Sequence, residues 1–228
     1  MNFGILLSGC GVYDGAEIQE AVLSMLAVAE SGDTYTCISV DADQFHVINH
    51  LTGEPMSESR NMLVEAARIA RGNIVPIEEI QPADLDGLII PGGFGSAKNF
   101  TKWAFEGPEG DIRPEVKLLL VNLVNIGKPV AALCVSPVVL AKALEGSAIH
   151  PLLTLGTTAE PSPYDIEAFS QGLQKTGAET TYKTVREVLV DEENKLITAP
   201  CYMMDASISD VWKNIQQAVA ELKKMASL

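Results

Sequence analysis

The sequence predicts an α/β fold in which a mostly parallel sheet is covered by helices on both faces. Short apolar segments alternate along the chain with longer segments that have helical spacing, and the apolar segments carry almost no polar residues. A strand that is followed by a helix and then by another strand pairs with it in parallel through a crossover. We therefore predict a three-layer α/β sandwich with a small antiparallel hairpin late in the chain.

Five apolar segments have the length and composition of buried strands. In chain order they are FGILLS (3–8), YTCISV (35–40), LDGLIIP (85–91), KPVAALC (128–134) and LLTLG (152–156). The segment EVLVDEENKLITAP (187–200) is typical of a hairpin that turns at Glu193 and Asn194.

Six segments with apolar spacing of three to four residues are predicted as helices. They cover 16–30, 57–71, 114–126, 136–145, 163–177 and 205–226, and glycines at 72 and 177 end two of them. In the first helix, Ile18, Ala21, Val22, Met25 and Leu26 share one face. No linker, repeat or low-complexity stretch interrupts the pattern, so we expect a single domain over 1–228.

The charge balance excludes some partners. With 30 acidic against 16 basic residues the net charge is −14, and no cluster of Lys or Arg occurs along the sequence. Nucleic acids and anionic membranes are therefore not expected partners, because both need concentrated positive charge. No apolar stretch approaches the ~20 residues of a membrane span.

The cysteines indicate a compartment. Four cysteines at positions 10, 37, 134 and 201 form neither a CxxC motif nor a disulfide framework, so we expect a reducing cytoplasm. The stretch LLSGC (6–10) has the look of a lipoprotein cleavage box, but no positive charge precedes it and its apolar part is too short. We predict that this stretch belongs to the first strand.

Three loops are expected to meet in one crevice. They are SGCGVYDGAE (8–17), PGGFGSAKN (91–99) and CVSP (134–137), and each follows a predicted strand. In open sheets of this kind, ligands bind outside the carboxyl ends of the strands.

Cys134 lies between a predicted strand and a predicted helix. Ser136 is a candidate N-cap and Pro137 suits the first helical position. A helix N-terminus favours an anion, so this position predicts a lowered thiol pKa and a nucleophilic thiolate. The alternative is that Cys134 is a small buried hydrophobic residue, as free cysteines often are.

Other candidate residues also allow two interpretations. Gly92 and Gly93 either bring backbone N–H groups to an oxyanion or form a tight turn. Glu17 and Glu20 either stabilise a helix N-terminus or supply a general base, and the helical wheel does not decide between these roles. Three histidines, His46, His50 and His150, form no metal-ligand pattern, so no metal or cofactor is expected.

In combination these motifs resemble a known superfamily. Strand–Cys–helix, an upstream PGG loop and GAExxE in the first helix are similar to the class I glutamine amidotransferase-like superfamily, near its PfpI and parkinsonism-associated deglycase branch. Longer stretches resemble the ElbB (enhancing lycopene biosynthesis, glyoxalase-type) family: LSGCGVYDGAEIQEAVL (7–23), VINHLTGE (47–54), RNMLVEAARIARG (60–72) and PGGFGSAKNF (91–100). The resemblance implies a flavodoxin-like arrangement of the sandwich and a homodimer, through the first helix.

The resemblance also implies roles for residues. Cys134 matches the family nucleophile, Glu20 the carboxylate beside it, and Gly93 and Val135 the oxyanion-hole positions. His150 is a candidate third member. Cys10, Gly92 and Cys201 are expected to line the pocket.

These roles imply a cofactor-independent glyoxalase. It would act on glyoxal or methylglyoxal through a Cys134 hemithioacetal, with Glu20 as the proton shuttle. Glutaminase and protease activity are not expected, because ITAPCYMMD (197–205) has no histidine and Val135 stands where the peptidase-like branch has one. The alternative is a redox-sensing or regulatory binding protein linked to isoprenoid biosynthesis, with Cys134 as a peroxide-oxidisable thiol.

Overall fold

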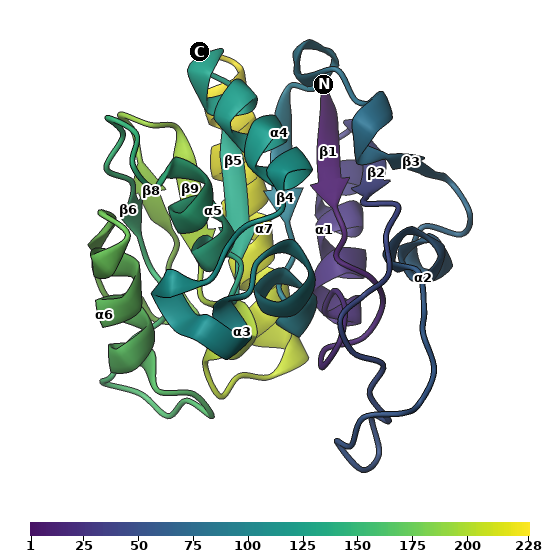
Figure 1. The fold of residues 1–228 in the computed structure, drawn as a ribbon. Helices are drawn as coiled ribbons and strands as arrows, with labels where there is room; N and C mark the ends of the chain where they lie inside the picture. Colours follow the sequence, from purple (N-terminus) through teal and green to yellow (C-terminus); the bar gives the residue numbers. More distant parts are fainter.

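A computed structural model describes residues 1–228 and has a seven-stranded sheet at its centre (Figure 1). The strands run in the order β3-β2-β1-β4-β5-β9-β8. Their bounds are β1 Asn2–Leu6, β2 Thr34–Ser39, β3 Ile74–Pro76, β4 Gly87–Ile90, β5 Val130–Leu133, β8 Leu189–Asp191 and β9 Leu196–Ala199. All neighbouring pairs are parallel except β8 with β9. The predicted mostly parallel sheet and the late hairpin are therefore confirmed.

Helices cover both faces of this sheet. The α-helices are α1 Ile18–Glu30, α2 Met62–Ile69, α3 Trp103–Glu106, α4 Pro114–Asn125, α5 Pro137–Leu144, α6 Ile166–Lys175 and α7 Ile208–Ala226. In Figure 1, α1 and α7 pack together behind the sheet, while α4 and α5 pack together in front of it. The predicted three-layer sandwich is confirmed.

Two strand predictions need correction. The segment predicted as a fifth core strand, 152–156, contributes only the short β6 (Leu152–Leu153), which pairs with β7 (Glu179–Thr180) in a separate two-stranded sheet. Its backbone leaves the strand geometry because Thr154 N–H bonds to the Thr198 side chain and Gly156 adopts a φ of 137°. The edge strand β3 was not predicted, because a strand of three residues is too short to show an alternating or a continuous apolar pattern.

The helix ends also differ from the prediction. Helix α2 begins only at Met62, because the Asn61 side chain caps the helix by accepting from the Val64 N–H at 3.0 Å. Residues 51–59 before it lie on the surface. The last helix begins at Ile208, where Ser207 and Asp210 form a reciprocal capping box.

The packing of α1 reverses one expectation from the helical wheel. Ile18, Val22 and Leu26 are exposed, at 45%, 46% and 42%. The buried face consists instead of smaller side chains together with one carboxyl: Glu20, Ala21, Ser24, Met25, Ala27 and Val28. Small residues allow α1 to approach the sheet and α7 closely, so Glu20 points into the protein.

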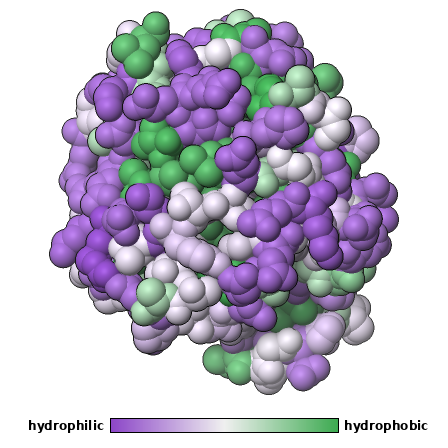
Figure 2. All heavy atoms as spheres, turned by 90° about the vertical axis from the view of Figure 1, so that its left-hand side faces the viewer, coloured by the Kyte–Doolittle hydropathy of each residue, from purple (hydrophilic) through white to green (hydrophobic).

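A single cluster of 54 buried apolar residues fills the space between the sheet and the helices. The face that carries α6 and the β8 edge is mainly hydrophilic, with apolar side chains in several separate groups (Figure 2). None of the helices has the length and apolarity needed to cross a membrane.

Candidate active site

Cys134 occupies a sharp turn between β5 and α5. Its φ is +56°, a left-handed conformation that is uncommon for residues other than glycine. The Cys134 N–H donates to the carbonyl of Ala199 on the neighbouring strand at 2.9 Å. This hydrogen bond holds the turn in place. The left-handed backbone at Cys134 directs its sulfur toward the carboxyl ends of β4 and β5.

Ser136 supports this turn in an unexpected way. It occupies the predicted N-cap position, but its side chain makes no cap hydrogen bond. Its hydroxyl donates instead to the Pro91 carbonyl at 2.7 Å and pairs with the Ser96 hydroxyl at 2.8 Å. Ser136 therefore joins the cysteine turn to the PGG loop.

The PGG loop brings backbone N–H groups to the thiol. The N–H groups of Gly93 and Val135 both bond to the Cys134 sulfur and favour its ionised form. Gly93 has a φ of +96°, and a Cβ there would meet the Glu17 N and the Gly15 O, each at 2.4 Å. Glycine is thus required at 93 for both conformation and space.

Glu20 is fully buried beside this loop. Its Oε2 accepts from the Gly92 N–H at 2.8 Å and its Oε1 accepts from the Tyr202 N–H at 3.3 Å. Glu17 forms the N-cap of α1 and accepts from the Glu20 N–H at 2.6 Å. The capping interpretation therefore holds for Glu17, which also lines the small cavity at the Cys134 sulfur, whereas Glu20 is fully buried beside the PGG loop and does not line that cavity.

Cys134 and Glu20 are in contact. The Glu20 charge raises the pKa of the thiol, and the thiol in turn lowers the pKa of Glu20, so the two side chains interact directly. A Cβ added at Gly92 would stand 2.6 Å from Glu20 Oε2 and 2.8 Å from the Cys134 sulfur. Only a glycine at 92 leaves the space in which these two groups meet.

Burial dominates the electrostatics of the pair. It raises the pKa of Glu20 to about 8, with a further increase from the charge of Glu17. Burial also raises the pKa of the Cys134 thiol above its ordinary value, and the Glu20 charge adds to this rise. The lowered thiol pKa expected from the helix N-terminus is therefore wrong, because desolvation of the sulfur outweighs the helix dipole and the two N–H bonds.

Both groups of the pair hold their protons at neutral pH, because the pKa of Glu20 is about 8 and that of the thiol is raised above its ordinary value. Ionising both groups would place two negative charges in contact inside the protein, so their titrations are coupled. Loss of one proton produces a thiolate bonded to a protonated carboxyl, or its tautomer. Either form has one acid and one nucleophile or base side by side, which suits proton transfer to a bound carbonyl compound.

A small cavity of about 20 Å³ opens at the sulfur. Ten residues line it: Val12, Glu17, Gly93, Phe94, Cys134, Val135, Tyr164, Phe169, Tyr202 and Met203. Cys134 is only 6% exposed, and it forms part of the wall of this cavity. The aromatic side chains of this wall lay outside the sequence prediction, although Phe94 stands within the quoted PGGFG loop.

Four candidate residues lie elsewhere. Cys10 does not line the cavity, since its charged neighbours are Glu65, Arg68, Asp14 and Arg60. Gly92 lies against both Cys134 and Glu20 but does not line the cavity, and Cys201 is fully buried beside the backbone N–H of Cys134. His150 is exposed, and its Nδ1 bonds to the Gly177 carbonyl at 3.0 Å, away from the thiol.

No group of three or more His, Cys, Asp or Glu side chains is arranged to hold a metal ion. His46 and His50 lie in the loop between β2 and α2. The polar groups at the sulfur are therefore the thiol, the carboxyls of Glu17 and Glu20, and backbone N–H groups.

Comparison with known proteins places this arrangement in a family. The chain is 36% identical over 225 residues to human glutamine amidotransferase-like class 1 domain-containing protein 3, mitochondrial, which covers 97% of this chain and 82% of the relative. It is 35% identical over the same length and shares to the rat ES1 protein homolog, mitochondrial. No protein-family model matches the chain.

Solved structures agree. The isoprenoid biosynthesis protein with amidotransferase-like domain from Ehrlichia chaffeensis superposes with a TM-score of 0.89 at 32% identity, over 99% of both chains. The ThiJ/PfpI domain protein from Brachyspira murdochii superposes with a TM-score of 0.57 at 14% identity, over 98% of this chain and 96% of that one. At that identity the second likeness concerns the fold alone.

Proposed function

The chain belongs to the ElbB branch of the glutamine amidotransferase-like class 1 family, and on this premise we propose that it is a glyoxalase acting on glyoxal or methylglyoxal. One observation carries the proposal: Cys134 and Glu20 are buried in contact, with no histidine in the cavity wall. A thiol activated by a carboxyl alone suits a reactive aldehyde, which needs no leaving-group protonation. The cavity of about 20 Å³ admits only a small reacting group.

The proposed reaction begins with addition of the thiol to the aldehyde. The Cys134 sulfur bonds to the aldehyde carbon, its proton passes to the Glu20 carboxylate, and the N–H groups of Gly93 and Val135 stabilise the oxyanion. Protonation of that oxygen gives a hemithioacetal. Glu20 then moves a proton from this carbon to its neighbour through an enediol, which yields a thioester. Water hydrolyses the thioester to glycolate or lactate and restores the thiol.

Product analysis tests this proposal. We expect purified protein to convert glyoxal into glycolate and methylglyoxal into lactate, detected by proton NMR against a protein-free control. The overall reaction adds one water and needs no oxidant, so acid formation should match aldehyde loss. Absence of either acid above the control rate would contradict the proposal.

The alternative use of Cys134 as a peroxide sensor has weaker support. Sensor thiols are accessible and have a lowered pKa, whereas Cys134 is almost fully buried and its pKa is raised. A regulatory role in isoprenoid biosynthesis has one support, the name of the Ehrlichia chaffeensis relative. A kcat/KM for glyoxal far below about 10⁴ M⁻¹s⁻¹ would favour such a binding role.

The cytoplasmic location stays a prediction. It rests on cysteine usage, while the human, rat and zebrafish relatives carry mitochondrial names.

We also propose that the chain forms a homodimer through α1. Ile18, Val22 and Leu26 are spaced by four residues and form an exposed apolar stripe on this helix. We expect Val22→Glu to convert a dimer into a monomer in sedimentation velocity. Leu118→Glu is the matched control, because Leu118 is a single exposed apolar residue on α4, at 62% exposure. Identical sedimentation of Val22→Glu and wild type would exclude α1 as the interface.

A further inference from the structure

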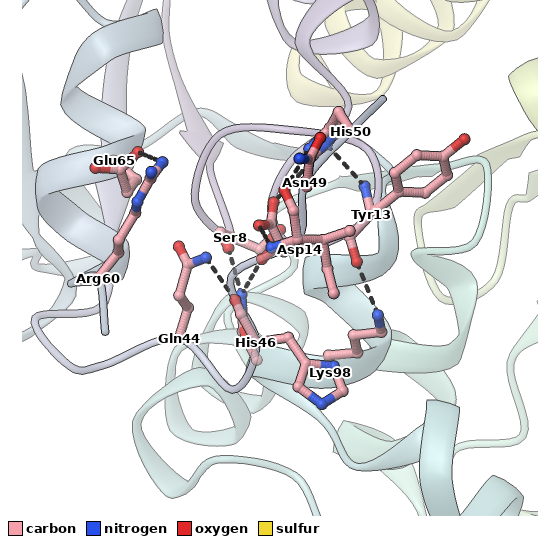
Figure 3. Close-up of polar contacts among 12 residues, drawn as sticks. Ser8, Tyr13, Asp14, Gln44, His46, Asn49, His50, Arg60, Glu65 and Lys98 are labelled. Carbon is pink, nitrogen blue, oxygen red and sulfur yellow. Dashed lines mark hydrogen bonds and ion pairs between the residues drawn. The ribbon is translucent and has the colours of Figure 1, made fainter. Parts of the chain in front are cut away.

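Lys98 is a half-buried cation near the catalytic cavity that has no carboxylate partner. Its Nζ donates to the Tyr13 carbonyl at 2.8 Å (Figure 3). The same nitrogen lies 5.5 Å from the centre of the Phe94 ring. None of the ion pairs of the chain includes it. Burial lowers the pKa of Lys98. An ammonium group has three donors, so two remain for a ligand.

The acid that acts most on Lys98 is already engaged. Asp14 is buried, its Oδ2 accepts from the Ile48 N–H at 2.6 Å, and its Oδ1 lies 3.9 Å from His50 Nε2. Figure 3 shows the His46 ring next to the Lys98 side chain. The Nδ1 atom of His46 is buried and has no hydrogen-bond partner. The ammonium therefore has polar neighbours but no counter-ion in contact.

The fold brings Arg113, which is paired with Glu115, to two lysines that are only four residues apart in the sequence. Three of the 16 Lys and Arg residues, Lys98, Lys102 and Arg113, line a cleft of about 570 Å³ together with Asp43 and Asp111. In a chain of net charge −14, such a grouping favours an anionic ligand over a cationic or neutral one.

Lys98 also lines a second hollow, which lies next to the cavity at Cys134. Phe94 lines the cavity at Cys134, and it also lines a hollow of about 430 Å³ that Lys98 shares. The other residues of that hollow are Tyr13, Ile48, Gly53 and Ala104. The Phe94 ring is therefore common to the cavity at the thiol and to the hollow at Lys98.

One segment contributes to both the cavity at Cys134 and the hollow at Lys98. The loop after β4 supplies Gly93 to the thiol, and it continues directly into the π-helix Ser96–Phe100, which carries Lys98. A π-helical turn is rare and is frequently found at functional sites. The distance along the chain between the oxyanion donor and the cation is thus only five residues.

We propose that the substrate of this site is an α-oxoaldehyde with an anionic tail, whose aldehyde reacts at Cys134 and whose carboxylate is bound by Lys98. This inference rests on the proposed glyoxalase function. The reaction is the same internal redox step: the aldehyde carbon is oxidised to a carboxylate, the neighbouring keto carbon is reduced to an alcohol, and one water is consumed. The tail takes no part in the chemistry and supplies binding energy.

A pair of substrates of equal length tests the proposal. The probe is 4,5-dioxopentanoate, which gives 2-hydroxyglutarate, and its neutral counterpart is 2-oxopentanal, which gives 2-hydroxypentanoate. We expect wild type to show a kcat/KM at least about tenfold higher for the anion, as a charge-assisted contact supplies. The ratio of kcat/KM for the anionic substrate to kcat/KM for the neutral one should fall toward one in Lys98→Met and recover in part in Lys98→Arg. Lys175→Met, an exposed lysine at the end of α6 with no ion pair, should keep the wild-type ratio.

The outcomes separate this inference from the function on which it rests. Equal kcat/KM values for the two substrates in wild type, or an equal loss for both in Lys98→Met, would overturn the role of Lys98 while leaving glyoxalase turnover intact. Calorimetric titration of Cys134→Ser with 2-hydroxyglutarate needs no turnover, and we expect binding that Lys98→Met, introduced into the same variant, weakens at least about tenfold. Absence of that binding would also overturn the inference. Binding without any turnover in wild type would contradict the glyoxalase proposal alone.

Discussion

Cys134→Ala is expected to lower kcat/KM for glyoxal and methylglyoxal by at least about 10³-fold, because the proposed mechanism passes through a bond to this sulfur. The fold should persist. Alanine occupies the same turn with φ near +56°, and the sulfur contacts that it loses are those of one small buried atom. The free energy of unfolding should therefore change by only about 1 kcal/mol, measured by urea denaturation.

Cys37→Ala is the matched control for this result. Cys37 is another buried free thiol, 3% exposed in β2, and it lies outside the cavity wall. Its replacement should lower stability by a similar amount and leave turnover within about threefold of wild type. Turnover that survives in Cys134→Ala at the wild-type rate would rule out the covalent mechanism.

Much of the fold could be predicted because buried parallel strands are continuous apolar runs. The segments around β1, β2, β4 and β5 have this character, and so does the hairpin of β8 and β9. Strands of two or three residues, such as β6 and β3, are too short to show a hydrophobic pattern in the sequence. Their pairing depends on tertiary contacts, among them the bond between Thr154 N–H and the Thr198 hydroxyl.

The candidate site could be predicted in part. The position of Cys134 at a strand–helix turn followed from local sequence, whereas its contact with Glu20 came only from the family resemblance. The helical wheel failed for α1 because it ranks faces by hydrophobicity, and here the larger apolar side chains face outward. The sign of the Cys134 pKa shift was missed because a sequence shows the helix N-terminus and does not show how deeply the sulfur is buried.

Glu20→Gln is expected to lower kcat about 10²-fold to 10⁴-fold while keeping the shape of the site. Glutamine has the same size, and its oxygen can accept from the Gly92 N–H as Glu20 Oε2 does at 2.8 Å. It cannot accept the thiol proton or carry a proton between two carbons. Loss of turnover in a variant that keeps the wild-type circular dichroism spectrum would therefore assign Glu20 to proton transfer.

The same substitution should change how stability depends on pH. The pKa of Glu20 is raised from 4.5 to about 8 in the folded protein, so between these values the folded chain keeps a proton that the unfolded chain releases. The wild type therefore loses stability as pH rises through this window, by up to about 5 kcal/mol, and the loss is complete above the folded pKa. Glu20→Gln removes this contribution, so its free energy of unfolding should fall less than that of wild type between pH 5 and pH 9.

Urea denaturation at a series of pH values measures this difference. Glu30→Gln is the control, since it removes an exposed carboxyl from the last residue of the same helix and should leave the wild-type pH profile unchanged. Parallel profiles for wild type and Glu20→Gln would show that Glu20 ionises in the folded state as readily as in the unfolded chain. The carboxyl could then not hold a proton at neutral pH, and the protonated state of Glu20 beside Cys134 would be excluded. A variant that is more stable than wild type above pH 8 and yet inactive would instead show that burying this carboxyl lowers the stability of the fold and is required for turnover.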